Sequence, residues 1–220
     1  MNSFELLLAL KRLGYLKNER EKLWWPNSGS FEVVAGAILT QQTKWSNVEI
    51  SLANLKGRHL LDPFALSDAD EYELSLLIAK SGFKSQKAAR LKRLSQNIVA
   101  DFGGFEEFAQ NVDREWLLAQ KGVGFESADA ILCYACLKPV MVVDSYTNRL
   151  LKGFGYEFES YDELQEWFYE GVLGRWERVR ELYSFDIDEN TLFARFHGKI
   201  VEFCKENAKA LDTRPLADLM

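Results

Sequence analysis

Cysteine and histidine are scarce in this sequence. Its 220 residues include three Cys and two His. Three cysteines cannot make the disulfide framework of a small secreted domain. Cys133 and Cys136 have the spacing of a redox or metal-binding pair, but they lie in an apolar stretch with helical periodicity, and two histidines are too few to complete a metal site. We therefore expect these cysteines to pack in a core, and we expect neither a metal nor another cofactor.

Long hydrophobic runs and linker-like segments are also missing. No apolar run approaches the roughly 18 to 20 residues that a membrane span needs. The first residues carry Glu5 within their apolar stretch and have no basic leader, which predicts no signal peptide and a cytoplasmic location. No Gly/Ser-rich or Pro-rich stretch divides the chain, so any two domains should share a close interface. A chain of this size buries about 70% of its unfolded surface, enough for an ordinary core.

The charge balance has two aspects. A net charge of −6 argues against a general binder of nucleic acids, because polyanions are repelled. One stretch is nevertheless strongly basic and contains no acid: Lys80, Lys84, Lys87, Arg90, Lys92 and Arg93. This stretch is interpreted either as a solvated helix face or as a local patch that faces phosphates.

Helical signals dominate, and the sequence predicts an all-α fold. The apolar residues repeat at helical intervals, and Ser, Asp or capping-box residues precede several of these runs. The only strand-like stretch, Val140–Val143, is too short and isolated to found a sheet. The predicted helices are a buried one from Phe31 to Thr40 after Ser30, 47–55 capped by Ser46, one after Ser67–Asp70, 84–102, 114–120 capped by Asp113, 126–137, one after Ser160–Glu163, and 190–209.

Lys121-Gly122-Val123-Gly124 joins two of these predicted helices. Glycine at both positions allows positive φ and a close approach of the backbone to a phosphate. The helix that follows adds its N-terminal dipole. A tight connection between helices also needs glycine, so the tripeptide alone fits a purely structural turn equally well.

Asp144 follows an apolar run and precedes a predicted helix, Ser145–Leu151. Aspartate is a favoured N-cap, which is a structural role. The same hydrogen bonds to backbone N–H groups lower the pKa of a carboxyl group and keep it ionised. An anion in that position can stabilise a cationic transition state, so the structural and catalytic interpretations are compatible.

Segment 115–149 resembles the helix-hairpin-helix and following aspartate of the endonuclease III superfamily of DNA glycosylases. Two other regions are similar to the pocket entry and the middle helices of that superfamily: Trp24-Trp25-Pro26 with residues 31–48, and Ser81-Gly82-Phe83 with residues 87–91. Within the superfamily, Trp-Trp-Pro, Gln-Gln-Thr-x-Trp and Glu126-Ser-Ala-Asp are most similar to the endonuclease III-like 3-methyladenine DNA glycosylases.

The resemblance implies a role for each matching residue. Asp144 would be the catalytic carboxylate. Gln42 would fill the gap left by an extruded nucleotide, and the hairpin would bind a DNA phosphate through Lys121, Gly122, Val123 and Gly124. The base-binding group would consist of Trp24, Trp25, Pro26, Trp45 and Glu126, although core packing is the alternative for the tryptophans. The implied partner is double-stranded DNA with alkylated bases, bound by a monomer that has no membrane association.

Two departures from the superfamily pattern refine the expected activity. Relatives that also cut the strand carry a lysine where this chain has Glu126, and a carboxylate cannot form the Schiff base of β-elimination. Lys121 is a weak substitute because it precedes the first hairpin glycine. Many relatives also hold an iron–sulfur cluster with four C-terminal cysteines. Here His197-Gly198 and Cys204 remain in that region, but residues 205–220 contain no cysteine, so we expect no cluster.

The resemblance also implies an architecture and a function. A six-helix barrel-like domain would span 28–138, with the helix-hairpin-helix at about 113–137. Residues 1–27 and 139–220 would form a second helical domain that carries Asp144, with the site in the cleft. We expect a monofunctional glycosylase that releases alkylated bases, chiefly 3-methyladenine, in base excision repair. The alternatives are a related glycosylase for oxidised pyrimidines or for mismatched thymine or adenine, and a non-catalytic helix-hairpin-helix DNA-binding protein.

Overall fold

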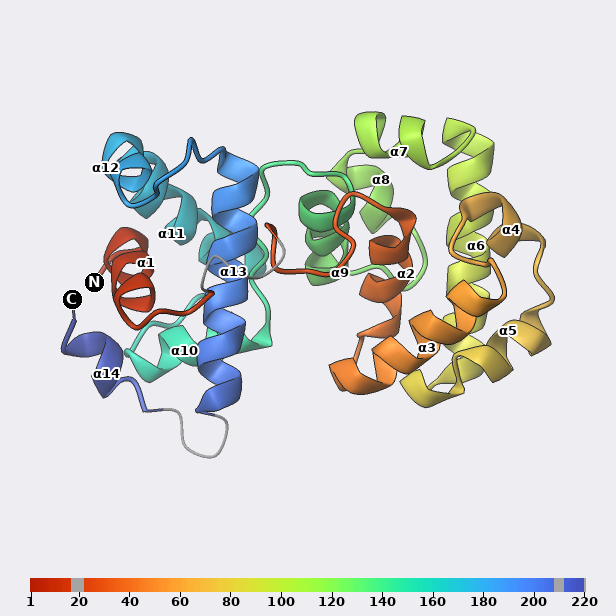
Figure 1. The fold of residues 1–220 in the computed structure, drawn as a ribbon, viewed down its shortest axis with the longest axis horizontal. Coiled ribbons are helices and arrows are strands. Elements are labelled where there is room, and N and C mark those ends of the chain that lie inside the picture. Colours follow the sequence, from red (N-terminus) through yellow and green to blue (C-terminus); the bar gives the residue numbers. More distant parts are fainter. Residues whose placement is uncertain (17–21, 208–211, 220) are drawn as a thin grey trace. The chain divides into compact units, whose positions relative to one another are not determined.

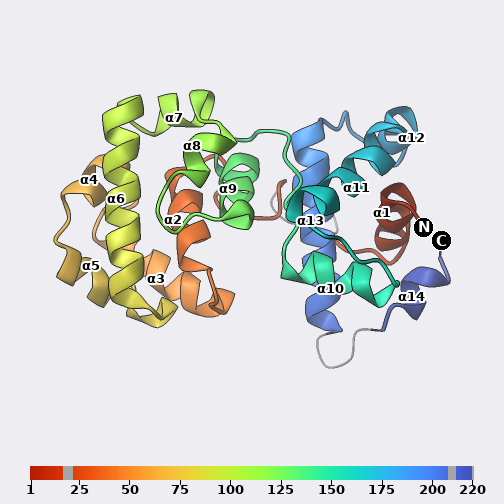
Figure 2. The same ribbon diagram turned by 180° about the vertical axis from the view of Figure 1, so that it is seen from behind.

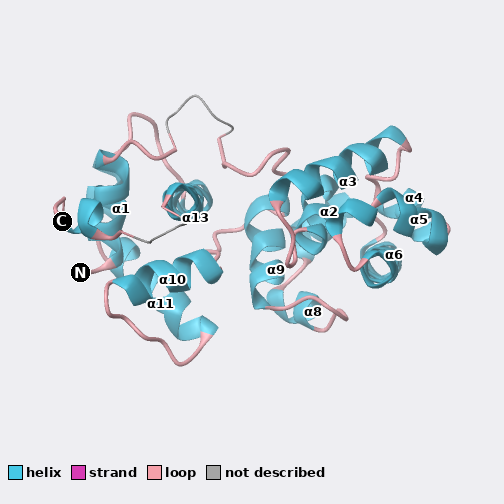
Figure 3. Ribbon diagram, turned by 90° about the horizontal axis from the view of Figure 1, so that it is seen from below, coloured by secondary structure: helices cyan, strands magenta, loops and turns pink. Residues whose placement is uncertain are grey.

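The computed structural model describes residues 1–16, 22–207 and 212–219, and this part of the chain contains helices but no strands (Figure 3). The all-α prediction is confirmed. None of the described helices is long and apolar enough to cross a membrane. Among the same residues, no three His, Cys, Asp or Glu side chains group in a way that could hold a metal ion.

The chain divides into two compact units. The first unit combines Met1–Pro26 with Pro139–Met220, and the second consists of Asn27–Lys138. The first unit therefore contains both ends of the chain, and the second is one continuous segment.

The second unit is arranged around the long helix α6, Lys84–Phe102, against which α4 and α5 pack (Figure 2). The helix begins and ends where the sequence predicts, and Gly103, at φ 74°, ends it in the left-handed conformation that glycine adopts easily. The other helices of the unit are α2 Phe31–Leu39, α3 Trp45–Gly57, α4 Pro63–Asp68, α5 Glu71–Leu77, the 3-10 turn η1 Ala79–Ser81, α7 Phe105–Asn111, α8 Arg114–Leu118, α9 Phe125–Ala130 and the π turn η2 Ile131–Ala135.

The first unit is arranged around α13, Glu189–Glu206, which packs against α1 and α10 (Figure 1). Most residues of α13 are buried, and Phe193, Phe196, Ile200 and Phe203 supply much of the apolar core of the unit. The remaining helices are α1 Ser3–Arg12, α10 Ser145–Gly153, α11 Tyr161–Leu173, α12 Trp176–Glu181 and α14 Arg214–Ala217. The predicted helix 190–209 is confirmed up to Glu206, and residues 208 and 209 lie outside the described residues.

Two predicted helix starts are wrong. Helix α3 begins at Trp45, so Ser46 lies inside the first turn and does not cap it. Ser67 lies in the last turn of α4, where its hydroxyl donates to the Phe64 carbonyl at 2.7 Å. Asp70 instead caps α5 by accepting from the backbone N–H of Glu73. In both cases a polar residue close to the boundary imitates the capping signal.

The other local predictions are mostly confirmed. Ser160 caps α11 by accepting from the Glu163 N–H at 3.0 Å, although the Glu163 carboxylate accepts from the N–H of Glu159 and so leaves the capping box incomplete. The predicted helix 126–137 is interrupted, because α9 changes into the buried π turn η2. Cys133 is fully buried in that turn, and burial raises the pKa of its thiol, as expected for a packing residue.

Candidate active site

Asp144 begins helix α10 and is held by its own capping interactions. One carboxylate oxygen, Oδ1, accepts from the Thr147 backbone N–H at 2.8 Å and from the Thr147 hydroxyl at 3.0 Å. The other oxygen, Oδ2, lies 3.5 Å from His197 Nε2. Burial raises the pKa of this carboxyl group, but the contacts with His197 and Thr147 outweigh burial and lower the pKa below its usual value. Asp144 is therefore an ionised carboxylate at neutral pH.

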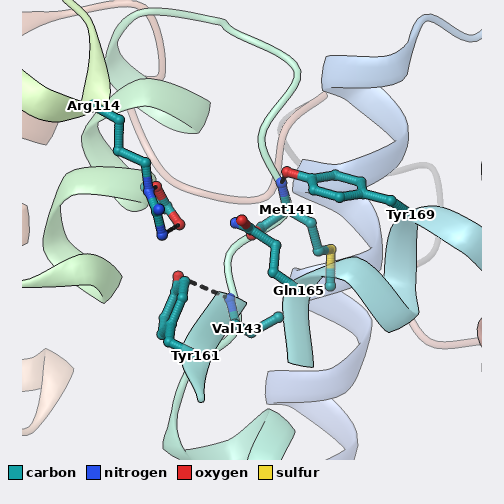
Figure 4. Close-up of polar contacts among 7 residues, drawn as sticks. Arg114, Met141, Val143, Tyr161, Gln165 and Tyr169 are labelled. Carbon is teal, nitrogen blue, oxygen red and sulfur yellow. Dashed lines mark hydrogen bonds and ion pairs between the residues drawn. The ribbon is translucent and has the colours of Figure 1, made fainter. Parts of the chain in front are cut away.

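The segment that leads to Asp144, residues 140–143, belongs to no helix or strand, and helix α11 supplies hydrogen-bond partners for it (Figure 4). The N–H of Met141 donates to the Tyr169 hydroxyl at 3.1 Å, and the N–H of Val143 donates to the Tyr161 hydroxyl at 3.3 Å. Gln165 donates to the Met141 carbonyl at 2.6 Å. Tyr161, Gln165 and Tyr169 are four residues apart, so one face of α11 fixes the backbone immediately before the candidate catalytic residue.

Trp24 lies next to the partner of Asp144. Its ring meets the His197 ring edge-on at 5.3 Å between centroids. A Cβ added at Gly198 would come within 2.5 Å of Trp24 Cγ, so the absence of a side chain on α13 makes room for this indole. Trp24 also has φ 72°, a conformation that non-glycine residues rarely adopt and that is often found at functional sites. Asp144, His197 and Trp24 therefore form one connected group within the first unit.

The other predicted base-binding residues have different environments. Trp25 is buried and meets Trp24 edge-on at 6.4 Å, so core packing accounts for much of its surface, while Pro26 is half-buried. Trp45, half-buried at the start of α3, belongs to the second unit. Glu126 is exposed in the first turn of α9, also in the second unit. The structure thus brings Trp24 and Trp25 together with the Asp144 unit, whereas Trp45 and Glu126 belong to the unit with the hairpin.

The predicted hairpin connects α8 to α9. Gly122 has φ 86°, a conformation that favours glycine, and an added Cβ would lie 2.4 Å from Arg90 Nε, so the Arg90 side chain would have to move. Glycine at both positions allows positive φ, and Gly122 adopts it, whereas Gly124 is an extended N-cap at φ −101°. A Cβ at Gly124 would meet nothing within 4 Å, so the start of α9 is open to an approaching group. Lys121 is exposed beside this turn, and Val123 is buried under it.

A buried ion pair holds the two helices of the hairpin together. Arg114, at the start of α8, donates from Nε to Asp129 Oδ1 at 2.8 Å and from Nη2 to Oδ2 at 3.2 Å. Asp129 is fully buried in α9, and the Arg114 guanidinium also lies 5.0 Å from the centroid of the Phe125 ring. A fork of two parallel hydrogen bonds fixes both distance and orientation, so the pair sets the angle at which α9 follows the turn.

Gln42 lies in the turn between α2 and α3. It is exposed and has φ 53°, and the Thr43 N–H donates to the Thr40 carbonyl at 3.1 Å to close the turn. Phe83, at the start of α6, shows the same combination: its side chain is 61% exposed and its φ is 43°. Two exposed side chains on strained backbone thus stand on adjacent loops, which are joined by the Thr43 hydroxyl donating to the Ser81 carbonyl at 2.6 Å.

The basic stretch from Lys80 to Arg93 is neither a solvated helix face nor a phosphate-facing patch along its whole length. Lys84 and Arg93 are exposed, but Lys87 is buried and Arg90 is half-buried under the hairpin. Lys87 Nζ lies 2.8–2.9 Å from four oxygens: the carbonyls of Leu39, Gln41 and Ser81 and the hydroxyl of Thr43. Burial and then the charge of Arg90 lower the pKa of Lys87 to about 8. The ammonium is therefore charged at neutral pH. It donates to backbone carbonyls and to the Thr43 hydroxyl, so it is not part of a phosphate-binding surface.

The sequence predictions give no individual role to three residues of the site: His197, Lys87 and Phe83. Two of them leave a signal in the sequence. Lys87 is four residues before Leu91 and therefore lies on the apolar face of α6, where a lysine needs buried partners. Phe83 directly follows Gly82 and precedes a helix. His197 leaves none, because its partner Asp144 is distant in the sequence.

Comparison with known proteins identifies the class. The model of the HhH-GPD superfamily of base excision DNA repair proteins matches residues 35–170. A protein of Methanocaldococcus jannaschii named as a candidate DNA repair glycosylase is 37% identical over 212 residues, which cover 93% of this chain and 90% of the relative. The chain belongs to the HhH-GPD superfamily of base excision DNA repair proteins. It is a DNA glycosylase of this superfamily.

Two solved structures extend the comparison. The H. pylori 3-methyladenine DNA glycosylase MagIII, solved with bound 1,N6-ethenoadenine, is 49% identical, with a TM-score of 0.91 over 94% of this chain and 99% of that one. A non-covalent endonuclease III–DNA complex has a TM-score of 0.74 over 100% of this chain and 95% of that one, at 18% identity. The second likeness shows the shared fold only.

Proposed function

We propose that this protein is a monofunctional glycosylase that hydrolyses the N-glycosidic bond of alkylated bases, chiefly 3-methyladenine, in double-stranded DNA. The observation that carries the proposal is the ionised Asp144 next to His197 and Trp24. The 49% identity with a 3-methyladenine glycosylase over nearly the whole chain supports the choice of base.

Cleavage of this N-glycosidic bond requires a fixed negative charge near the sugar more than it requires a general acid that protonates the base. A 3-methylated adenine is cationic, so it leaves with the electron pair of the bond to C1′ and becomes neutral without receiving a proton. The sugar develops positive charge as that bond breaks, and the Asp144 carboxylate stabilises it. Water then adds to C1′ and loses a proton, which Asp144 or solvent accepts. Since Oδ1 is bound by Thr147, Oδ2 is the oxygen that serves this purpose.

The aromatic side chains favour a cationic base. A positively charged ring gains about 0.5–2 kcal/mol from each contact with an indole face, whereas neutral adenine does not. Trp24 is the strongest candidate, because it is half-buried and lies next to the Asp144–His197 pair. Trp25, Pro26, Trp45 and Glu126 are proposed to complete the base-binding group.

The second unit is proposed to bind the DNA around the lesion. The open N-terminus of α9 at Gly124, with Lys121, Gly122 and Val123, would hold a backbone phosphate through N–H groups. Gln42, exposed on its turn, would enter the space that the extruded nucleotide leaves. We propose that the protein acts as a monomer and needs no cofactor.

Base release from defined DNAs tests the proposal. Purified protein is incubated with methylated DNA, with DNA containing oxidised pyrimidines, and with duplexes carrying mismatched thymine or adenine, and the freed bases are separated by chromatography. We expect 3-methyladenine to be the main product. Release of a different base would identify another glycosylase of the superfamily, and no release from any DNA would indicate a non-catalytic DNA-binding protein.

Borohydride trapping tests the monofunctional character. With Glu126 at the hairpin position where strand-cutting relatives carry lysine, we expect no covalent enzyme–DNA adduct. Endonuclease III serves as the positive control, since a covalent intermediate of that enzyme with DNA has been trapped. An adduct that disappears in Lys121→Met would instead assign the amine to Lys121.

A further inference from the structure

The loop that carries Gln42 and the hairpin are joined by one side chain, Gln41. Its amide nitrogen donates to the Gly122 carbonyl at 2.9 Å and to the Ser127 hydroxyl at 3.0 Å. Its amide oxygen accepts from Arg90 Nη1 at 3.1 Å. The amide nitrogen of Gln41 is therefore bound to the hairpin and its amide oxygen to α6, and Gln41 is the residue immediately before Gln42.

Lys87 holds the other side of the same loop. Three of its four oxygen partners come from residues 39–43, and the fourth is the carbonyl of Ser81, two residues before Phe83. Arg90, one turn further along α6, lies directly under Gly122 and donates to Gln41. One helix thus connects the Gln42 turn, the Phe83 turn and the hairpin through adjacent cations.

Two of the connected turns have a costly backbone conformation. Gln42 and Phe83 are not glycines, yet both have positive φ. Non-glycine residues in this region cost of order 1–3 kcal/mol and persist only where the surroundings enforce them. A buried polar network whose donors and acceptors are satisfied has the rigidity that this requires.

We propose that Gln41 and Lys87 are positioning residues that keep Gln42 and Phe83 in register with the phosphate-binding hairpin. This inference rests on the proposed function, in which Gln42 enters the duplex while the hairpin holds a phosphate. Neither residue touches the reacting atoms. They hold the loop and the hairpin so that one position of the protein on DNA allows Gln42 to enter the duplex and the hairpin to bind a phosphate. Binding at a site that lacks a stacked base then needs no further rearrangement of the protein.

The test compares affinity for two duplexes of the same sequence, one undamaged and one containing a tetrahydrofuran abasic site. In Gln41→Met, we expect affinity for the abasic duplex to fall about tenfold, because two hydrogen bonds to the hairpin are lost, while affinity for undamaged DNA changes less than about twofold. Gln41→Glu keeps the acceptor for Arg90 but sets an oxygen against the Gly122 carbonyl, so its loss should be larger than that of Gln41→Met.

Two matched control variants change residues of α6, the helix that carries Lys87. Asn97→Leu removes a 2.6 Å hydrogen bond from α6 to Gln120, close to the hairpin but unconnected with the Gln42 turn. Lys92→Met removes a lysine that donates to the Ala69 carbonyl at 2.8 Å. Both should keep the wild-type ratio of abasic to undamaged affinity. Lys87→Met should lower that ratio about tenfold or more if it folds; if it does not fold, the two Gln41 variants decide the question.

A local probe distinguishes positioning from simple stability. With 2-aminopurine placed opposite the abasic site, wild-type binding should change the fluorescence, and Gln41→Met at saturating protein should give less than half of that change. Equal loss of affinity for both duplexes, or an unchanged ratio with full fluorescence change, would overturn the inference. The abasic duplex contains no base to excise, so a failure of wild type to release 3-methyladenine would refute the proposed function without affecting this result.

Discussion

The two units each bury a charged side chain, and they use it differently. In the second unit, Lys87 is surrounded by four oxygens at 2.8–2.9 Å, most of them backbone carbonyls. In the first unit, Asp144 uses Oδ1 for the α10 cap and presents Oδ2 to His197 at the longer distance of 3.5 Å. A charge that is fully coordinated fixes a conformation, whereas a charge with one loosely held oxygen remains available for chemistry. The predictions below test this contrast.

The largest expected effect is on catalysis by Asp144→Asn. The amide oxygen can still accept from Thr147, so α10 stays capped, but the negative charge is lost. We expect release of 3-methyladenine to fall by about a hundredfold or more, as for other charge-stabilising groups, with affinity for abasic DNA within about threefold of wild type.

Asp188→Asn is the matched control for that variant. Asp188 caps α13 in the same unit and accepts from the N–H of Thr191, three residues on, as Asp144 does from Thr147. It should retain full activity. If Asp144→Asn retained more than about a third of the wild-type rate, Asp144 would be a cap and not the catalytic carboxylate.

The next effect concerns a buried charge that is purely structural. Asp129 is fully buried and accepts two hydrogen bonds from Arg114, whose side chain is 30% exposed and stays partly solvated when its partner is removed. We expect Asp129→Ala to lower the free energy of unfolding by about 2–3 kcal/mol in urea denaturation.

Base release per folded molecule separates Asp129 from Asp144. Asp129→Ala should lose far less activity per folded molecule than Asp144→Asn does. Asp101→Asn serves as the exposed control, since Asp101 accepts a surface hydrogen bond from Trp116 Nε1 at 2.9 Å, and this substitution should cost about 1 kcal/mol or less. A catalytic loss in Asp129→Ala as large as in Asp144→Asn would remove the distinction between the two kinds of buried charge.

A smaller effect should follow from Gly198→Ala. The new Cβ would meet Trp24 within 2.5 Å and displace the indole from its place beside His197. We expect kcat/KM for 3-methyladenine release to fall about tenfold, which corresponds to ~1.4 kcal/mol of transition-state binding. Gly171→Ala, which would meet Ser3 between α11 and α1, should lower stability but leave the kcat/KM of folded protein unchanged. The same kcat/KM in both variants would argue against a role for Trp24 in base binding.

The last prediction is a pH dependence of stability at Lys199. Burial, and then the charges of Arg195 and Lys11, lower its pKa to about 7 from an ordinary value of 10.5. Between these two pH values the unfolded chain holds a proton that the folded protein has released, so stability rises with pH by up to about 1.4 kcal/mol per unit.

Urea unfolding of wild type and Lys199→Met at pH 6 and pH 9 measures this slope. The difference between the two proteins should shift in favour of wild type at pH 9. Lys87, whose pKa is about 8, has the same sign of effect, but both proteins contain it, so its contribution cancels in the difference. A difference that does not change with pH would mean that Lys199 stays protonated in the folded protein.

Local physical chemistry made much of this molecule predictable from its sequence. Helix α6 has the bounds of the predicted helix 84–102, and Asp113 and Asp144 cap the helices expected of them. These signals work because hydrogen bonds within one turn and side-chain spacing along one helix depend on neighbours in the chain. The turn between α8 and α9 could be located for the same reason, since Gly122 has the positive φ that glycine allows, whereas its role as a phosphate-binding hairpin was implied by the family resemblance.

Only the tertiary structure decided which side chains meet. The sequence places Lys87 on the apolar face of α6, but only packing shows that its partners are three backbone carbonyls and the Thr43 hydroxyl. His197 becomes the partner of Asp144 only when α13 packs against α10. Trp24 likewise depends on the missing side chain of Gly198. These contacts join residues that are far apart in the chain, and the free energy that selects them comes from burying whole helix faces, which no short stretch of sequence records.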